Sequence, residues 1–323
     1  MAGYNLIEAV SHALAIPKST AKRIAETARH RYKIFKIPKK RKPEKRTVAQ
    51  PAREVKLIQK EIVRLLEPKL PVHWCAKAYK KRTSIKENAE VHTDCNFLTK
   101  LDFIDFFSCI SREDIFNHFQ KFNSQLELDK ENIDFVLNAC TWNQGAIEKL
   151  SLCIGAPSSP WLSNTIMYDF DTYVVTACTS LGVNYSRYSD DISISCSEPK
   201  ILIEAEKKIS EIIRSIHYPR LRLNQEKRVA VGRSAAMRVT GLTLTNDGHV
   251  SVGRKRKRGV RAGVNRYVLG KLSDNEIARL KGELAFVLSV EPDFSQTLIK
   301  TYSDADLTAL LPKRLDANGE ASY

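Results

Sequence analysis

The sequence predicts an α+β fold in which helices and antiparallel strand pairs alternate along the 323 residues. Apolar residues recur at helical spacing in several segments, whereas other segments are short apolar runs on either side of polar turns. Hydrophobic residues make up 43% of the chain and charged residues 28%, proportions typical of a globular protein with a packed core. The chain is longer than one ordinary domain, so about two or three subdomains are expected.

The N-terminal part of the chain predicts two helices with a basic hairpin between them. Ser19 and Thr20 can cap a helix that runs to about residue 31, and apolar residues at helical spacing predict a second helix over 55–65. The segments 32–37 and 47–49 are predicted strands around a turn rich in Lys, Arg and Pro. Such a hairpin presents its cations together and is therefore a candidate phosphate clamp.

The central and C-terminal parts predict further strands and helices in alternation. Residues 97–103 have the pattern of a buried strand, and Ser111 with Asp114 matches a capping box at the start of a helix. Another helix is expected from Ser159 to about Cys178. The remaining predicted elements are two short strands over 183–195, a helix over 201–216, a hairpin of 239–244 with 249–252 around an Asn-Asp-Gly turn, and helices beyond 254.

Charge is distributed unevenly along the chain, which is the first indication of function. The formal net charge of +15 favours a polyanionic partner, either nucleic acid or an anionic membrane. The segments 31–46 and 254–266 hold nine and seven Lys or Arg residues, whereas 101–150 hold nine acidic residues against four basic ones. The chain therefore has an acidic centre between two basic arms.

Other features argue against a membrane protein and against a cysteine or histidine metal site. The longest charge-free stretch, 150–168, contains two prolines and several serines, so it does not suit a membrane span of roughly 20 residues. The amino terminus has no secretory pattern, so a cytoplasmic protein is expected. The seven cysteines and seven histidines lack the spacing of zinc or redox sites. We therefore expect reduced, mostly buried cysteines and a nucleic-acid partner.

Two groups of carboxylates lie where apolar strands end. Asp190 and Asp191 are adjacent in the tight turn of 188–191, where like charges repel each other unless cations bind them. Asp102 ends the strand predicted over 97–103, where a buried carboxylate needs a partner or a metal. Convergence of the two groups on a pair of Mg²⁺ ions would suit in-line phosphoryl or nucleotidyl transfer. The alternatives are an ordinary solvated turn and a helix cap at a strand end.

Five motifs follow one another along the chain, and their order is more specific than any one of them. They are Asn88-Ala89-Glu90-Val91-His92, Asp102, Gly155-Ala156-Pro157-Ser158-Ser159-Pro160 with Leu162-Ser163-Asn164, Tyr188-Ser189-Asp190-Asp191, and Val239-Thr240-Gly241. With this order and spacing the chain resembles the bacterial retron reverse transcriptases over nearly its whole length. The first and last motifs resemble the Asn-Ala-x-x-His and Val-Thr-Gly signatures of the retron enzymes.

The resemblance implies a right-hand polymerase fold. The N-terminal helices and fingers would occupy 1–95, and the palm 96–248, interleaved with fingers helices over about 111–155. A helical, basic, RNA-binding thumb would occupy 249–323. The implied reaction is RNA-templated DNA synthesis, in which dNTPs extend a primer and pyrophosphate is released.

The resemblance also assigns catalytic roles. Asp102, Asp190 and the Phe103 carbonyl would hold two Mg²⁺ ions, for which Mn²⁺ can substitute, with Asp191 in support. Lys227 resembles a lysine proposed to protonate the leaving pyrophosphate, and its alternative is a solvated strand-end cation. The implied partner is a dedicated structured non-coding RNA, whose internal guanosine 2′-hydroxyl primes a branched, RNA-linked single-stranded DNA (msDNA). Phage defence and an effector protein from the same operon complete the implied system, which involves no membrane.

Substrate contacts carry over residue by residue. Phe107 sits where an aromatic ring crowds the sugar 2′ position, and Arg46 is similar to the fingers arginine that contacts the triphosphate. The alternatives are that Phe107 is plain core and that Arg46 is one of nine interchangeable charges. The expected nucleotide-binding residues are Arg46, Lys39, Lys40, Phe107, Ala156 and Pro157. The expected RNA- or DNA-binding residues are Asn88, His92, Arg238, Thr240, Gly241, Arg254, Lys255, Arg256, Lys257, Arg258 and Arg261.

Two departures and two competing functions bear on this assignment. Ser189 stands where retron enzymes usually have Ala, and Ile154 stands where Gln commonly precedes Gly-Ala-Pro, which removes a side-chain hydrogen bond to the nucleotide. Asn88 and His92 can hydrogen-bond a loop instead of contacting RNA. The competing functions are a reverse transcriptase of group II intron or diversity-generating type, and a catalytically silent RNA-binding scaffold for an effector.

Overall fold

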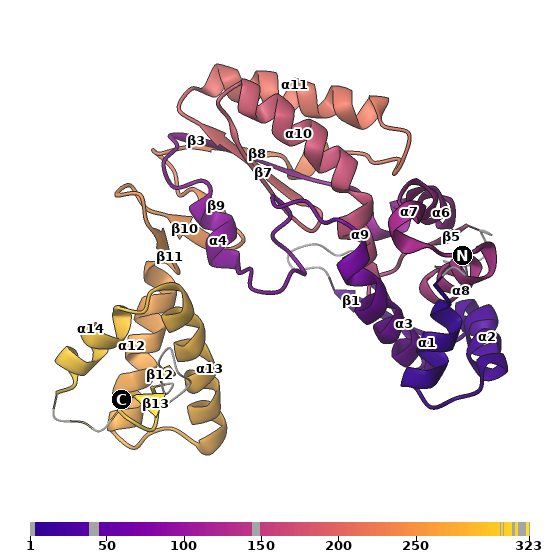
Figure 1. Cartoon of the computed structure of the whole chain (residues 1–323). Coiled ribbons are helices and arrows are strands. Elements are labelled where there is room, and N and C mark those ends of the chain that lie inside the picture. The colour runs from indigo at the N-terminus through magenta and orange to yellow at the C-terminus, as the bar shows by residue number, and fades with distance from the viewer. Residues whose placement is uncertain are drawn as a thin grey trace. The chain divides into compact units, whose positions relative to one another are not determined.

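The computed structural model describes residues 4–38, 45–143, 149–303, 305, 307–311, 314–315 and 321–322 (Figure 1). The chain forms two compact units, of which the first is Met1–Thr83 with Phe97–Ala230 and the second is Ser84–Asn96 with Val231–Tyr323. Each unit thus joins two stretches that are separate in the sequence. Among the described residues, no helix combines the length and the apolar character needed to cross a membrane.

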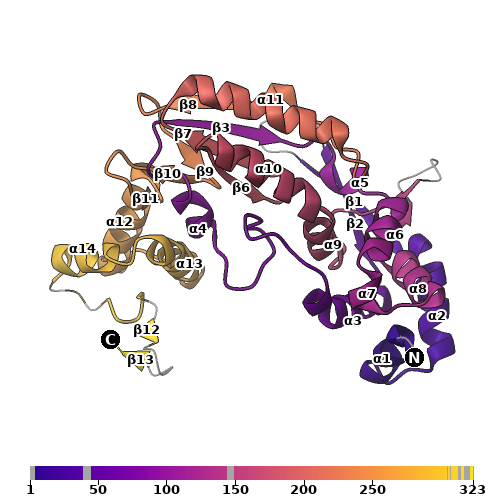
Figure 2. The same ribbon diagram turned by 45° about the horizontal axis from the view of Figure 1, so that its top comes forward.

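The first unit is built on a four-stranded sheet. Its strands, in spatial order, are β6 (Asn184–Tyr188), β7 (Asp191–Cys196), β3 (Phe97–Asp102) and β8 (Val229–Gly232). β7 pairs antiparallel with both of its neighbours. Helices α10 (Tyr168–Ser180) and α11 (Pro199–Ser215) pack against each other, α10 on β6 and α11 on β3 and β7, so they cover one face of the sheet (Figure 2).

Apolar side chains hold the sheet and its helices together. β7 is buried along its length apart from Asp191, and Ile194 is part of the main core. On α11, Leu202, Ala205 and Ile209 recur at helical spacing and are buried. Removing such apolar surface from water, worth roughly 25 cal/mol per Å², is the main favourable contribution to folding. The predicted strand over 97–103 and the predicted helix over 201–216 are both confirmed.

A second layer of the first unit is helical. It comprises α1 (Leu6–Ala13), α2 (Lys18–Thr27), α3 (Arg53–Leu66), α6 (Arg112–Lys121) and α8 (Lys130–Cys140), with α2 and α6 both packed on α8. α6 begins at the predicted capping box: Ser111 Oγ accepts a hydrogen bond from Asp114 N at 3.1 Å, and the Asp114 carboxylate accepts one from Ser111 N at 2.8 Å. The caps predicted for α2 are wrong, because Pro17 is its N-cap and the helix already includes Ser19 and Thr20.

The predicted basic hairpin is also confirmed. β1 (Tyr32–Pro38) pairs antiparallel with β2 (Lys45–Pro51), and β1 is largely exposed. Lys39 and Lys40 lie outside the described residues. The other elements of this unit are α5 (Phe106–Cys109), α7 (Asn123–Leu126), α9 (Ser159–Ile166), β4 (Trp142–Asn143), β5 (Leu150–Ser151) and the 3₁₀ helices Ala28–His30, Glu67–Lys69 and Gln225–Lys227.

The second unit joins a small sheet to a set of helices. Helix α4 (Ile85–Glu90) packs on the three strands β9 (Arg238–Val239), β10 (Leu242–Leu244) and β11 (Val250–Ser251), with β10 in the centre. The helices α12 (Arg254–Val268), α13 (Asp274–Val290) and α14 (Phe294–Thr301) follow. Two further short strands, β12 (Arg314–Leu315) and β13 (Ala321–Ser322), pair with each other.

Two expectations about the fold are corrected. The predicted strand over 239–244 turns back on itself at Thr240 and Gly241, whose φ angles of 47° and 85° allow a two-residue turn between β9 and β10. The predicted helix from Ser159 to Cys178 is divided into α9 and α10. The second compact unit groups the segments 84–96 and 231–248 with the C-terminal helices, because α4 packs on β9, β10 and β11. The expected division into fingers, palm and thumb stays a prediction.

Candidate active site and basic groove

The sheet register brings the three predicted carboxylates to one edge of the first unit. In the β3–β7 pair, Asp102 lies opposite Asp191. In the β6–β7 pair, Tyr188 lies opposite Asp191, so Ser189 and Asp190 form the tip of the hairpin. The Phe103 amide donates a hydrogen bond to the Asp190 carbonyl at 3.2 Å, which attaches the end of β3 to this tip. Carboxylates far apart in the sequence therefore share one site.

The carboxylates act on one another electrostatically. Burial raises the pKa of Asp190, and the charge of Asp102 raises it further, whereas Lys227 and Arg46 act in the opposite direction. Partial removal of its carboxyl group from water, together with the charges of Asp190 and Asp102, raises the pKa of Asp191 to about 6. The negative charge of Asp102 thus opposes the ionisation of both hairpin carboxylates. A cation between them would relieve this repulsion.

Lys227 supplies a positive charge at this site. Its Nζ lies 2.7 Å from Asp102 Oδ1, and its side chain is 43% exposed. The 3₁₀ helix Gln225–Lys227 is held close by the Asn224 amide, which donates a hydrogen bond to the Asp102 carbonyl at 2.7 Å. The structure therefore places Lys227 directly against a predicted metal ligand, and not at a remote solvated strand end.

The donor set fits a hard divalent cation by its chemistry. Carboxylate and backbone carbonyl oxygens are the ligands that Mg²⁺ prefers, and the mutual repulsion of the three carboxylates favours a bound cation. Within the described ranges, no three His, Cys, Asp or Glu side chains come together as a formed metal site. In this arrangement the Lys227 ammonium partners Asp102, so a metal ion at that carboxylate would compete with Lys227.

A buried ion pair supports the hairpin tip, and sequence reasoning missed it. Arg187 and Asp171 are both fully buried, and their closest atoms, Arg187 Nη2 and Asp171 Oδ2, are 2.6 Å apart. Arg187 Nη1 donates hydrogen bonds to the Ser189 carbonyl at 3.0 Å and to Asn164 Oδ1 at 3.2 Å. Tyr185 Oη donates to Asp171 Oδ1 at 2.9 Å. The only sequence signal was an Arg within an otherwise apolar and small-residue strand.

Phe107 lies partly at the surface, in the short helix α5 that follows Asp102 along the chain. Phe106 is buried and its ring is 5.4 Å from that of Phe107, whereas Phe107 is only partly buried. On its other side, the Phe107 ring centroid is 6.5 Å from that of Tyr79. Phe107 thus packs against the core without being enclosed by it, so an edge of the ring is available to a ligand.

The Gly-Ala-Pro segment is attached to the basic hairpin. The Ala49 amide of β2 donates a hydrogen bond to the Ile154 carbonyl at 2.8 Å. Gly155 has a φ of 114°, and a Cβ there would lie 2.7 Å from the Ala49 carbonyl oxygen, so the close approach requires glycine. Ala156 is buried in a small apolar cluster with Ala49. Nucleotide binding by Ala156 and by the half-buried Pro157 stays a prediction.

The two short signature motifs are joined in the second unit, where the first is buried. Asn88 and His92 are 2% and 0% exposed, and burial lowers the pKa of His92 to about 3. The Thr240 hydroxyl donates a hydrogen bond to the Ile85 carbonyl at 3.0 Å, which links the β9–β10 turn to the start of α4. This burial fits the alternative in which Asn88 and His92 hold a loop, and their contact with RNA stays a prediction.

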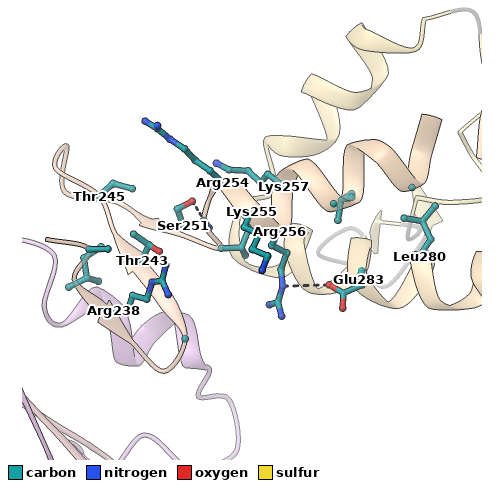
Figure 3. Close-up of a pocket in the computed structure, with 18 of the residues that line it drawn as sticks. Arg238, Thr243, Thr245, Ser251, Arg254, Lys255, Arg256, Lys257, Leu280 and Glu283 are labelled. Atoms are coloured by element: carbon teal, nitrogen blue, oxygen red, sulfur yellow. Dashed lines mark hydrogen bonds and ion pairs between the residues drawn. The ribbon is translucent and has the colours of Figure 1, made fainter. Parts of the chain in front are cut away.

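The second unit also contains a basic groove of about 1330 Å³ (Figure 3). It is lined by the small sheet, α12 and α13, and it includes eight basic side chains against three acidic ones. The basic residues are Arg233, Arg238, Arg254, Lys255, Arg256, Lys257, Arg266 and Arg279, and the acidic residues are Asp247, Glu276 and Glu283.

The groove divides the predicted RNA-binding cluster into paired and unpaired cations. Arg256 pairs with Glu283 at 3.5 Å, as Figure 3 shows, and Lys257 pairs with Glu291 at 2.8 Å. Within the part of the chain that the structure describes, Arg238, Arg254 and Lys255 form no ion pair. The expected RNA-binding residues Arg258 and Arg261 do not line the groove, and Arg261 lies over the Phe294 ring at 5.2 Å.

Comparisons with known proteins agree with this arrangement. Residues 37–244 match the family described as reverse transcriptase (RNA-dependent DNA polymerase). The chain is 34% identical over 281 residues to the Retron Ec83 reverse transcriptase of Escherichia coli, covering 86% of this chain and 89% of that relative. It is 31% identical over 297 residues to the Retron Ec86 reverse transcriptase of the same organism, covering 91% and 88%.

A solved structure of low sequence identity shares the fold. Telomerase from Candida albicans, in complex with a fragment of telomeric RNA, superposes with a TM-score of 0.50 at 14% identity. The match covers 93% of this chain and 59% of the telomerase chain, so this chain spans less than two thirds of that protein.

Proposed function

The chain belongs to the reverse transcriptases and, among them, to the bacterial retron enzymes, and on this premise we propose that it copies part of a dedicated structured RNA into msDNA. It is an RNA-directed DNA polymerase with a polymerase fold. In the proposed reaction an internal guanosine 2′-hydroxyl of the RNA primes synthesis in the cytoplasm. The branched product and an effector protein from the same operon would serve in phage defence.

One observation carries the catalytic part of this proposal. Asp102 lies opposite Asp191 at the sheet edge, with Asp190 at the adjoining hairpin tip and Lys227 against Asp102. These groups suit nucleotidyl transfer because the reaction needs negative ligands for metal ions and a positive charge near the leaving pyrophosphate. The basic groove of the second unit supports the RNA partner, because unpaired cations attract phosphates.

The proposed mechanism assigns a role to each side chain. Two bound Mg²⁺ ions, or Mn²⁺ in their place, would lower the pKa of the attacking hydroxyl and neutralise the triphosphate. Asp102 and Asp190, with the Phe103 carbonyl, would hold the ions, and Asp191 would support them. Lys227, once it leaves Asp102, would donate a proton to the departing pyrophosphate. Arg46, which already acts electrostatically on Asp190, would bind the triphosphate.

Synthesis without an added primer tests the proposed priming. The purified protein with its copurifying RNA is incubated with dNTPs and Mg²⁺ and without any DNA or RNA primer. The expected product is DNA covalently joined to RNA. RNase treatment should shorten this product, but the DNA should keep the ribonucleotides of the branch. If the protein extends only supplied primers, the 2′-hydroxyl priming is wrong while the polymerase activity stands.

Phe107 is proposed to exclude ribonucleotides by contact with the sugar. Its ring is partly exposed and lies next to Tyr79, whose hydroxyl is near Ser189 of the hairpin, so Phe107→Val should open space for a 2′-hydroxyl. We expect the ratio of ribonucleotide to deoxynucleotide incorporation to rise about tenfold or more. A steric clash of this kind lowers the rate of ribonucleotide incorporation by at least about tenfold. The measurement is single-nucleotide extension with each substrate. The matched control is Phe116→Val, a partly exposed Phe on α6, and an unchanged ratio with lowered stability would assign Phe107 to the core.

The basic groove gives a second prediction, which concerns only the cations that form no ion pair. Arg254→Ala with Lys255→Ala removes two cations that line the groove and form no ion pair within the described residues. We expect weaker binding of the cognate RNA and a salt slope that falls by about 1 per lost phosphate contact. Extension of a supplied primer and template should suffer less than synthesis on the cognate RNA.

A control with the same loss of charge is available on the same helix. Arg258→Ala with Arg261→Ala also removes two cations of α12, yet neither residue lines the groove. Fluorescence anisotropy with labelled RNA at several salt concentrations compares the two double variants. Equal salt slopes for both would show that the groove is not the RNA-binding surface and that the cluster acts as a general basic face.

A further inference from the structure

Tyr79 is an exposed aromatic residue in an unusual backbone conformation next to the catalytic hairpin. Its side chain is 50% exposed, and its φ of 59° lies in the left-handed region that bulky residues rarely adopt. Such a conformation persists only where the surroundings hold it, and it is found most often at functional sites. The conformation of Tyr79 is therefore consistent with a functional position, and its neighbouring contacts hold it there.

Buried groups hold the backbone on the N-terminal side of Tyr79. Asn164 Nδ2 donates a hydrogen bond to the Ala78 carbonyl at 2.8 Å, and Asn164 Oδ1 accepts one from Arg187 at 3.2 Å. The Lys77 amide donates to the Arg187 carbonyl at 2.8 Å. Because Asn164 and Arg187 are 2% and 0% exposed, these bonds are shielded from water and fix the backbone of residues 77–78 against the hairpin.

The side chain of Tyr79 is held by the hairpin tip itself. Tyr79 Oη and Ser189 Oγ are 3.2 Å apart, within hydrogen-bond distance. Arg187 binds the carbonyl of the same Ser189, so the serine is held through both its backbone and its side chain. Ser189 immediately precedes Asp190 in the turn between β6 and β7, so this contact holds the Tyr79 hydroxyl at the tip of the catalytic hairpin.

The ring of Tyr79 extends towards Phe107. The two ring centroids are 6.5 Å apart, with an angle of 48° between the ring planes. Both rings are partly exposed, so the pair presents an apolar surface that is joined to the hairpin tip where Tyr79 Oη meets Ser189 Oγ. Aromatic surfaces of this kind pack against sugars and bases of nucleotides without sequence preference.

We propose that Tyr79 is a substrate-positioning residue, which forms with Phe107 the surface against which the incoming nucleotide packs. The hydrogen bond to Ser189 sets the position of the Tyr79 ring relative to Asp190. The Ser189 hydroxyl therefore positions Tyr79 in this chain, because an alanine at position 189 could not form this hydrogen bond. The inference rests on the proposed assignment of Phe107 and the carboxylates to the nucleotide site.

Four variants separate the ring from its hydrogen bond. Tyr79→Ala removes the ring, whereas Tyr79→Phe and Ser189→Ala each remove only the hydrogen bond. The double variant Tyr79→Phe with Ser189→Ala removes the hydroxyl groups at both ends of this bond. The matched control is Tyr173→Phe, which deletes a hydroxyl from a Tyr of similar exposure on α10. Each protein is tested by single-nucleotide extension of a supplied DNA primer on an RNA template.

The expected result is a change in KM for the nucleotide. Tyr79→Ala should raise the KM for dNTP about tenfold, as expected for the loss of one aromatic contact, with a smaller change in kcat. Tyr79→Phe and Ser189→Ala should each raise it about threefold, and the double variant should match either single one, because all three lose the same bond. The affinity for primer and template, measured by anisotropy without nucleotide, and the melting temperature should stay close to those of the Tyr173→Phe control.

Other outcomes overturn the inference. If Tyr79→Ala weakens primer and template binding and leaves the nucleotide KM unchanged, Tyr79 contacts the template strand. If it lowers only the melting temperature, Tyr79 is structural. If the effects of the two hydrogen-bond variants add in the double variant, the bond does not position the ring. Because a primer is supplied, these results do not depend on whether the enzyme primes from a 2′-hydroxyl.

Discussion

Asp190→Asn is expected to reduce DNA synthesis by about a thousandfold or more while leaving the fold and RNA binding intact. The substitution keeps the shape of the side chain and removes the charge that a metal ion requires, and each tenfold loss in rate corresponds to about 1.4 kcal/mol of transition-state stabilisation. Burial and Asp102 raise the pKa of Asp190, so its ionised form is disfavoured in the folded protein. Neutral Asn should therefore leave the melting temperature unchanged or raise it.

The measurement is single-nucleotide extension with Mg²⁺, accompanied by thermal melting and RNA-binding assays. The matched control is Asp105→Asn, which neutralises an exposed carboxylate close to the same strand end. Asn tolerates the left-handed conformation of residue 105, where φ is 48°, so this control should remain folded. An extension rate for Asp190→Asn equal to that of the control would contradict the metal assignment.

Asp171→Asn is expected to destabilise the first unit by about 3–5 kcal/mol, the usual effect of leaving one charge of a buried ion pair without its partner. Arg187 is fully buried, and Asp171 accepts hydrogen bonds from its Nε and Nη2 atoms. The Arg187 guanidinium also binds the Ser189 carbonyl, so activity should fall together with stability. The expected result is that the first unit unfolds at a much lower urea concentration than in the wild-type protein.

Hydrogen exchange with mass spectrometry measures this change in stability, because it follows the amides of β6 and β7 separately from those of the second unit. The control for stability alone is the double variant Arg187→Met with Asp171→Leu, which replaces the pair by apolar side chains and should recover much of the lost stability. It should not recover activity, since Arg187→Met removes the donor to the Ser189 carbonyl. Recovery of full activity would show that Arg187 has no part in positioning the hairpin.

Elements fixed by neighbouring residues were predictable from the sequence. The basic hairpin over 32–51, the capping box at Ser111 and the strand before Asp102 depend on local patterns, and the structure confirms each of them. The hairpin of 188–191 was predictable for the same reason, since a polar pair separates two apolar runs. The candidate carboxylates followed from these strand ends.

Features that depend on distant residues were not predictable in the same way. The partner of Arg187 is Asp171 in a preceding helix, and no sequence spacing identifies it. The link between Thr240 and Ile85 joins segments that lie far apart in the chain, so the burial of Asn88 and His92 could not be deduced from their own motif. Which cations of α12 form ion pairs depends on acidic residues outside that helix, namely Glu283 in α13 and Glu291 directly after it.

Sequencing of the nucleic acid that copurifies with the protein tests the central claim most directly. The wild-type protein is expected to carry one structured RNA species and a single-stranded DNA of defined ends joined to it by a 2′-linked branch. Asp190→Asn is expected to carry the same RNA without the DNA, because RNA binding does not depend on the catalytic carboxylate. A mixture of unrelated cellular RNAs on both proteins, with no branched DNA on the wild type, would contradict the proposal that this enzyme copies a dedicated RNA.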